Sequence, residues 1–234
     1  MRILVINPNS SKHMTEHIRA EILRIKRDDT EVTVVANTGA PPAIESARDV
    51  AQAVPPLLEQ VTRANEEGYD AIILACFSDP GLQAAREISD ILVLGIEETT
   101  LHVAAMLGHK FTILTPLAKR IPAKEREVRG YGLESALASV RSLDLSVSET
   151  DADPEATKAR ILELARQARD EDGAEVIVLG CAGMVGYAKD VEQELGLVVL
   201  DPTSVAFKIA EGLIESGVRH SKQGPYFAVS IRQQ

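Results

Sequence analysis

The chain of 234 residues is poor in aromatic residues and in cysteine. It has no Trp, its aromatic fraction is 3%, and it contains two cysteines. Proteins that bind single-stranded nucleic acid stack bases on aromatic rings, so this scarcity argues against that function. The net charge of −10 also disfavours phosphate backbones and anionic lipid surfaces, because like charges repel. We therefore expect neither a nucleic-acid partner nor a membrane partner.

Long apolar segments are also missing from the sequence. No apolar run approaches the roughly 20 residues that span a bilayer. The opening, MRILVINP, is too short in its apolar part for a signal peptide. The expected location is the cytoplasm, where thiols stay reduced, so the two cysteines are not expected to form a disulfide framework.

What the sequence does contain is a regular alternation of short apolar runs with helical patterns. Met14, Ile18, Ile22 and Ile25, for example, recur at the spacing of one helix face. Strands that alternate with helices form parallel sheets covered on both faces, which predicts an α/β fold. The expected strands are residues 3–6, 31–36, 71–75, 91–96, 111–114, 143–147, 175–180 and 197–200. The polar stretch 148–154 is expected to be a loop before a helix over 155–169.

Two pieces of the sequence occur twice. Residues 72–76 (IILAC) parallel 177–181 (IVLGC) at an offset of 105, and residues 5–8 (VINP) parallel 113–116 (ILTP) at an offset of 108. A near-constant offset indicates an internal repeat. We expect two pseudo-symmetric, flavodoxin-like parallel-sheet halves with the functional site between them. The first half is predicted to comprise residues 1–97 and 210–234, and the second residues 98–209.

The two cysteines occupy equivalent places in this repeat. Ligands of open parallel sheets bind beyond the carboxyl ends of the strands, where Cys76 and Cys181 are expected. A helix is expected after each, with Asp79 as an N-cap and Pro80 at the first helical position. A helix N-terminus favours thiolate and offers N–H groups to an oxyanion.

Two thiols on opposite sides of one cavity would permit a two-base proton transfer. One thiolate removes a proton from a stereocentre, and the other thiol returns a proton to the opposite face. The alternative interpretation is a pair of buried structural cysteines. Their matched positions in the repeat favour the catalytic interpretation.

Three motifs resemble those of the aspartate/glutamate/hydantoin racemase superfamily, and more narrowly its hydantoin and allantoin racemase branch. They are residues 6–11 (INPNSS) with Met14 and Thr15, residues 75–82 (ACFSDPGL) and residues 179–184 (LGCAGM). Residues 38–41 (TGAP) and 43–46 (AIES) resemble the loop after the second strand of that branch. The resemblance covers nearly the whole chain.

The resemblance implies racemisation of 5-substituted hydantoins or allantoin, with Cys76 and Cys181 as the two bases and no cofactor, neither metal nor pyridoxal phosphate. Amino-acid racemases of the superfamily carry Asn-Thr and Thr-His after their cysteines. Here Phe77 and Ser78 follow the first cysteine, and Ala182-Gly183 follow the second. These less polar residues fit a neutral ring better than a zwitterion, although glycine is more usual at the position of Ser78.

Four further residues are candidates for substrate binding. Asn7 and Thr115 end the equivalent first strands of the two halves, where they would face the cavity or support the turn at the following proline. Ser10 would contact substrate or cap the next helix. Ile44 belongs to a loop that is expected at the rim of the same cavity.

His13 and His17 lie four residues apart, a spacing that can hold a metal, but no third ligand is evident and no metal is predicted. Two rival functions stay open. One is a related cysteine-dependent decarboxylase or cis–trans isomerase, and the other is a non-catalytic two-lobed protein that binds a small ligand. Apolar helix positions such as Leu101, Ala105 and Met106 are typical of core or subunit contacts, so a homo-oligomer is expected.

Overall fold

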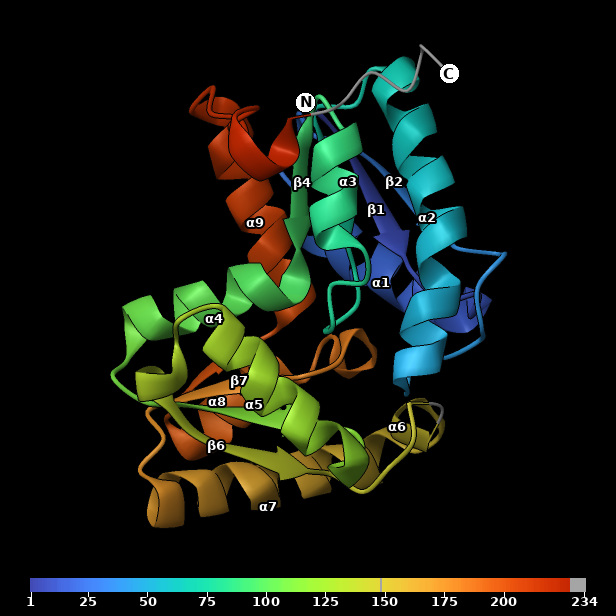
Figure 1. Ribbon diagram of the computed structural model, residues 1–234. Coiled ribbons are helices and arrows are strands. Elements are labelled where there is room, and N and C mark those ends of the chain that lie inside the picture. Colours follow the sequence, from blue (N-terminus) through green and yellow to red (C-terminus); the bar gives the residue numbers. More distant parts are fainter. Residues whose placement is uncertain (148, 228–234) are drawn as a thin grey trace.

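The protein contains two four-stranded parallel sheets, described here in a computed structural model over residues 1–147 and 149–227. The first sheet, in the upper part of Figure 1, has the order β2-β1-β3-β4, and the second has the matching order β6-β5-β7-β8. The strands are β1 (Arg2–Asn7), β2 (Glu31–Ala36), β3 (Ala71–Leu74), β4 (Leu92–Gly95), β5 (Phe111–Thr115), β6 (Leu137–Ser142), β7 (Val176–Leu179) and β8 (Val198–Leu200). The predicted α/β fold with two similar parallel-sheet halves is confirmed.

Helices connect the strands and cover the sheets (Figure 1). They are α1 (Lys12–Ile25), α2 (Ala47–Glu67), α3 (Leu82–Ile88), α4 (Ile96–Leu107), α5 (Ile121–Gly130), α6 (Glu149–Ala152), α7 (Pro154–Asp172), α8 (Ala188–Leu195) and α9 (Pro202–Glu215), with the short 3₁₀ helix η3 at Ala182–Met184. The predicted apolar face of α1 is confirmed, because Met14, Ile18 and Ile22 are buried. Among the described residues, no helix is both long and apolar enough to cross a membrane.

The core lies where the central strands are covered on both faces. Every residue of β3, β5 and β7 is buried, and so is every residue of β1 after Arg2. Continuous apolar runs therefore suit these strands, since neither face meets water. The edge strand β6 is only half-buried along its length.

The strand predicted at residues 143–147 is wrong, because β6 occupies Leu137–Ser142 instead. Ser and Arg interrupt the apolar residues of this edge strand, which hid it in the sequence. Its Arg141 is held by ion pairs to Asp172 (2.6 Å) and Glu171 (2.7 Å). After the strand, Asp144 adopts a left-handed backbone conformation. The loop predicted at 148–154 contains α6, and Ser148 lies outside the described residues.

The last helix, α9, packs on α1, α4, β3 and β4. It therefore returns to the first sheet after the second sheet is complete. The exact division of the chain into residues 1–97 with 210–234 and residues 98–209 stays a prediction.

Candidate active site

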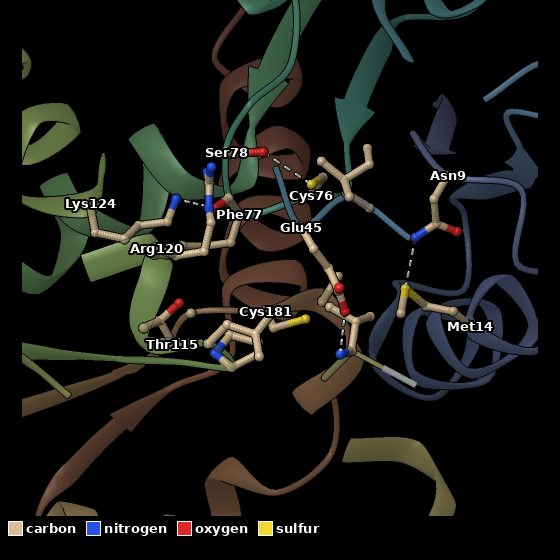
Figure 2. Close-up of a pocket in the computed structure, with 17 residues that line it drawn as sticks. Asn9, Met14, Glu45, Cys76, Phe77, Ser78, Thr115, Arg120, Lys124 and Cys181 are labelled. Atoms are coloured by element: carbon tan, nitrogen blue, oxygen red, sulfur yellow. Dashed lines mark hydrogen bonds between the residues drawn. The ribbon is translucent and has the colours of Figure 1, made fainter. Parts of the chain in front are cut away.

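A pocket lies between the carboxyl ends of the two sheets. The first half contributes the loops after β1, β2 and β3 together with α1, and the second half contributes the loops after β5, β6 and β7 together with α5. Cys76 and Cys181 both line it. In Figure 2 the two side chains enter the pocket from its upper and lower sides, and both sulfur atoms point inward.

The two cysteines are anchored in the same way in both halves. The residue before each cysteine continues the sheet by donating its N–H to the neighbouring central strand: Ala75 to the carbonyl of Ile6, and Gly180 to that of Leu114, both at 2.8 Å. Each thiol is thereby fixed to the rigid centre of a sheet rather than to a mobile loop. The repeat in the sequence therefore corresponds to the same strand end and the same backbone hydrogen bond in each half.

The Cys76 thiol is partly buried and lies 3.3 Å from the hydroxyl oxygen of Ser78. Burial raises the pKa of Cys76 to about 12, and negative charge on Cys181 raises it further, while Ser78 and Lys124 oppose the shift. The expectation that a nearby helix N-terminus favours the thiolate of Cys76 is wrong. The physical reason is that α3 begins only at Leu82, six residues after the thiol.

Cys181 lies directly before η3, and its sulfur accepts a hydrogen bond of 3.3 Å from the N–H of Gly183. A donor at this distance stabilises negative charge on the sulfur. A Cβ at Gly183 would lie 3.3 Å from the terminal carbon of Met14 and 3.4 Å from the sulfur itself. Glycine therefore permits the close packing of this turn on the thiol.

Asp79 does not cap its own helix, which corrects the prediction. Its backbone has a positive φ of 39°, and Gly81 is the N-cap residue of α3. The carboxylate instead accepts hydrogen bonds from the N–H groups of Glu97 (3.0 Å) and Glu98 (2.8 Å), in the first turn of α4. Burial raises the pKa of Asp79 to about 7, against the effect of these two donors.

Five of the eight residues predicted to bind substrate line the pocket, namely Ile44, Phe77, Ser78, Thr115 and Ala182. Asn7, Ser10 and Gly183 are not among its lining residues.

Asn7 is fully buried and supports a neighbour that does line the pocket. Its side-chain N–H donates to the side-chain oxygen of Asn9 at 2.8 Å and to the hydroxyl of Thr15 at 3.0 Å. The capping alternative for Ser10 is wrong, because Ser11 caps α1 by accepting from the N–H of Met14. The N–H of Ser10 donates to the carbonyl of Pro41.

Charged residues of the pocket were missed in the sequence. Glu45, Arg120 and Lys124 line it, as do Asn9 and Met14. Glu45 adjoins the predicted Ile44 within a motif already singled out, so the signal for it was present. Arg120 and Lys124 lie in a strongly charged segment that resembles a solvated helix surface, and nothing in the sequence marks them.

Lys124 is a buried cation with three partners. Its ammonium group donates to the carbonyl of Phe77, to Glu97 at 2.8 Å and to Glu127 at 2.7 Å. Burial raises the pKa of Glu97 well above its usual value although Lys124 opposes the shift, and one oxygen of this carboxyl has no hydrogen-bond partner. The ammonium group thus ties the loop that follows Cys76 to α4 and α5.

The two histidines noted in the sequence contact one another, with ring centroids 4.2 Å apart. In the part of the chain that the structure describes, no group of three or more His, Cys, Asp or Glu side chains has the arrangement of a metal site.

Comparison with known proteins places this geometry in a family. The model for Asp/Glu/Hydantoin racemase matches residues 3–210. The chain belongs to the Asp/Glu/hydantoin racemase family, and it is an enzyme of the isomerase class. A hydantoin racemase of Pseudomonas sp. (strain NS671) is 37% identical over 226 residues, which cover 97% of this chain and 91% of that protein.

Two solved structures share the whole fold. The allantoin racemase from Klebsiella pneumoniae superposes with a TM-score of 0.94 at 36% identity, covering 97% of this chain and 93% of that chain. The allantoin racemase of Pseudomonas fluorescens also gives 0.94, at 31% identity, covering 100% of this chain and 99% of that one. The predicted family resemblance is confirmed.

Proposed function

We propose that this protein racemises 5-substituted hydantoins, allantoin among them, by two-base proton transfer between Cys76 and Cys181, without a metal or pyridoxal phosphate. One observation carries the proposal: two thiols at equivalent strand ends enter a single pocket from opposite sides. The hydantoin and allantoin racemases to which the chain is similar support the substrate class.

The proton at carbon 5 of a hydantoin is acidic because its removal gives an enolate with the adjacent carbonyl. One cysteine thiolate takes this proton and becomes a thiol, while the other thiol gives its proton to the opposite face and becomes a thiolate. The enzyme is then ready for the opposite enantiomer. Negative charge on Cys181 raises the pKa of Cys76, which favours a site with one thiol and one thiolate.

The enolate requires positive charge or donors near its oxygen. Backbone N–H groups after the two cysteines are expected to supply such donors, but those of Ser78 and Asp79 both donate to the carbonyl of Cys76, at 2.8 and 3.0 Å. The N–H of Gly183 donates to the Cys181 sulfur. Arg120, which lines the pocket, is the residue we assign to the enolate oxygen.

Decarboxylation is the rival reaction on the same fold. It needs a single thiol to protonate an enolate, so a second thiol at the equivalent strand end favours racemisation. The cytoplasmic location and the homo-oligomeric state are kept as proposals. Support for the latter comes from Met106 and Leu107, which are exposed at the end of α4.

A substrate panel followed by polarimetry tests the function. We expect loss of optical rotation with allantoin or with aliphatic or aromatic 5-substituted hydantoins, and unchanged rotation with aspartate and glutamate. Activity should persist after exhaustive chelation and without added pyridoxal phosphate. Turnover of the amino acids but of no hydantoin, or activity that requires zinc, would contradict the proposal.

A further inference from the structure

Two buried carboxylates outside the pocket connect the cysteine loops to helices. The first is Asp79, three residues after Cys76, whose carboxylate holds the N–H groups of Glu97 and Glu98 at the start of α4. The fit leaves no room for a side chain beside it, because a Cβ at Gly95 would lie 2.2 Å from the carboxyl carbon of Asp79. The loop after Cys76 is thus tied directly to α4.

The second carboxylate is Asp201, which is 6% exposed. As the N-cap residue of α9, it accepts from the N–H groups of Thr203 (2.9 Å) and Ser204 (3.1 Å) through one oxygen. Its other oxygen accepts from the N–H of Gly186 at 3.1 Å, in the turn that follows Cys181 and η3. The loop after Cys181 is thus tied directly to α9.

These connections are equivalent but reciprocal. Helices α4 and α9 each follow the fourth strand of a sheet, so they are matched elements of the two halves. In the first half the carboxylate belongs to the cysteine loop and reaches the helix, whereas in the second half it belongs to the helix and reaches the cysteine loop. The same link between cysteine loop and helix is therefore made by an aspartate of the loop in one half and by an aspartate of the helix in the other. For this reason no repeated residue marks the link in the sequence.

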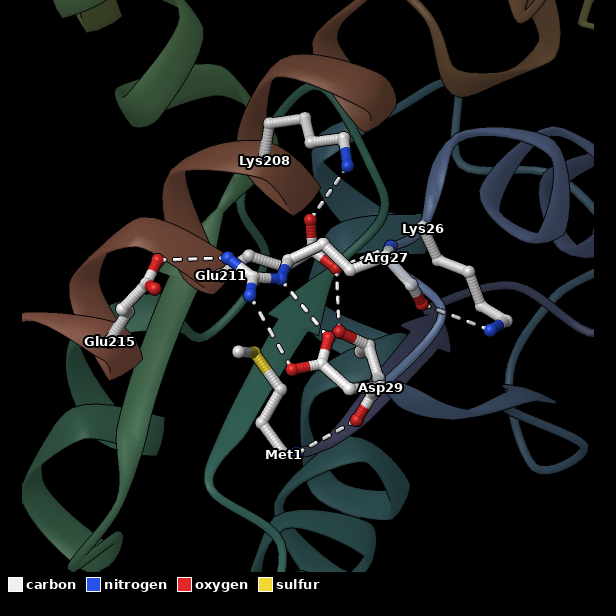
Figure 3. Close-up of polar contacts among 8 residues, drawn as sticks. Met1, Lys26, Arg27, Asp29, Lys208, Glu211 and Glu215 are labelled. Atoms are coloured by element: carbon white, nitrogen blue, oxygen red, sulfur yellow. Dashed lines mark hydrogen bonds and ion pairs between the residues drawn. The ribbon is translucent and has the colours of Figure 1, made fainter.

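Helices α4 and α9 also join the two ties to one another. They pack together, and the hydroxyl of Thr100 in α4 lies 3.4 Å from the carbonyl of Pro202 in α9. Farther along α9, Glu211 accepts from the N–H of Arg27 at 3.0 Å and from the hydroxyl of Thr30 at 2.7 Å, and Glu215 pairs with the Arg27 side chain (Figure 3). Helix α9 therefore fixes the loop of Cys181 to the first half of the molecule.

We propose that Asp79 and Asp201 are positioning residues, one for each thiol, and that each sets the rate of the proton transfer at its own cysteine. The proposal rests on the two-cysteine function above. A displacement of about 1 Å at a reacting group can lower a rate about 100-fold. A carboxylate that holds backbone N–H groups keeps its loop in one place, and an amide oxygen and nitrogen in its position cannot accept both bonds.

Net racemisation cannot separate the two roles. Because the equilibrium constant is one, kcat/KM for the two directions must change by the same factor whichever residue is replaced. The rates at which the two enantiomers exchange their carbon-5 proton with deuterium oxide are not linked by the equilibrium constant, since each enantiomer presents its proton to one thiol. We therefore choose the initial rate of exchange, followed by proton NMR on each enantiomer separately at about pH 8.5. At this pH both carboxylates are ionised, because burial raises the pKa of Asp79 only to about 7 and that of Asp201 only to about 6.

Asp79→Asn is expected to slow exchange of one enantiomer about 10- to 100-fold, and this enantiomer should be the one whose exchange Cys76→Ser abolishes. Asp201→Asn is expected to slow exchange of the other, the one that Cys181→Ser loses. In each variant the exchange rate of the other enantiomer should stay within about threefold of wild type, because each substitution displaces the loop of one cysteine only.

Two further variants keep the test decisive if an Asn variant does not fold. Gly95→Ala pushes a methyl group into the Asp79 carboxylate without removing its charge, and it should reproduce the selectivity of Asp79→Asn. Asp201→Ser retains a good N-cap for α9, but the serine side chain is too short to accept from the N–H of Gly186 as well. This variant should therefore show the same selectivity between enantiomers as Asp201→Asn. The matched control is Asp153→Asn, the same change at the N-cap of α7, where the carboxylate accepts from the N–H of Ala156 at 3.0 Å. It should leave both exchange rates within about twofold of wild type.

Equal slowing of both enantiomers by these variants would overturn the proposal, and so would a wild-type pattern in Asp201→Ser. If at the same time Cys76→Ser and Cys181→Ser keep opposite preferences, the two-cysteine function stands and only the positioning role is wrong. If those two cysteine variants prefer the same enantiomer, the function itself is wrong.

Discussion

The carboxylate of Glu45 accepts a hydrogen bond of 2.9 Å from the backbone N–H of Val147, which lies 102 residues further along the chain. The bond joins the loop after β2 in the first half to the loop after β6 in the second, and both residues line the pocket. Figure 2 shows the Glu45 side chain beside the space between the two cysteines. This hydrogen bond therefore joins the two halves at the rim of the pocket.

Glu45→Ala should raise KM about tenfold with a smaller change in kcat. A hydrogen bond to a charged group contributes about 1.5–3 kcal/mol, and about 1.4 kcal/mol is a tenfold change in an equilibrium constant. Steady-state polarimetry separates the two parameters. Glu45→Gln, whose amide oxygen can still accept from Val147, should recover most of the affinity. Glu59→Ala, on the exposed side of α2, is the matched control. An unchanged KM in Glu45→Ala would remove the rim contact from substrate binding.

The raised pKa of Cys76 predicts a distinctive pH profile of alkylation. In the Cys181→Ser variant only Cys76 can react with iodoacetamide. Burial, the largest cause of the raised pKa of Cys76, is unchanged in this variant, so the thiolate fraction stays small. The rate should therefore rise about tenfold per pH unit between roughly pH 7 and 10, with no plateau.

An exposed thiol provides the comparison. Ser216→Cys, placed at an exposed position in a background without Cys76 and Cys181, should reach its plateau above about pH 8.5, the ordinary cysteine pKa. A plateau of Cys76 in that same range would show that burial does not control its ionisation.

Lys124→Met should destabilise the protein strongly. The lysine side chain is 2% exposed and its partner Glu97 is fully buried, so the substitution leaves a carboxyl without its compensating charge. Breaking a buried pair in this way costs about 3–5 kcal/mol. Urea unfolding measures the loss. Lys158→Met, which removes a partly exposed pair to Asp190, should change the free energy of unfolding by less than about 1 kcal/mol.

The pH dependence of the Lys124→Met variant has a definite sign. Burial already raises the pKa of Glu97, and removal of the lysine raises it further. The native state then binds more protons than the unfolded state, so the free energy of unfolding should increase as pH falls from 8 to 6. A variant that instead loses stability over this range would show that Glu97 stays ionised without Lys124.

The sequence predicted the pieces of this molecule that depend on local pattern. The apolar strand ends at Cys76 and Cys181 repeat with a near-constant offset, and parallel strands end at one edge, so the place of both thiols followed from the sequence. The apolar face of α1 followed from the spacing of its apolar residues in the same way.

What the sequence missed depends on contacts between distant segments. Asp79 resembled the cap of the next helix, but its partners are 18 and 19 residues away at the start of α4. Lys124 looked like a surface residue of a charged helix, because its burial comes from α4 and the loop after Cys76. Strand β6 was misplaced because its charges are compensated by α7, which local patterns do not reveal.

Exchange of the carbon-5 proton by Cys76→Ser and Cys181→Ser, followed by proton NMR in deuterium oxide on each hydantoin enantiomer separately, tests the two-cysteine mechanism most directly. Replacing a thiol by a hydroxyl raises the pKa of that group far above its usual value near 8.5, so each variant should lose net racemisation. Each should still exchange the proton of one enantiomer with retention, and the two variants should prefer opposite enantiomers. Exchange of the same enantiomer by both variants, or near-normal racemisation by either, would contradict the account.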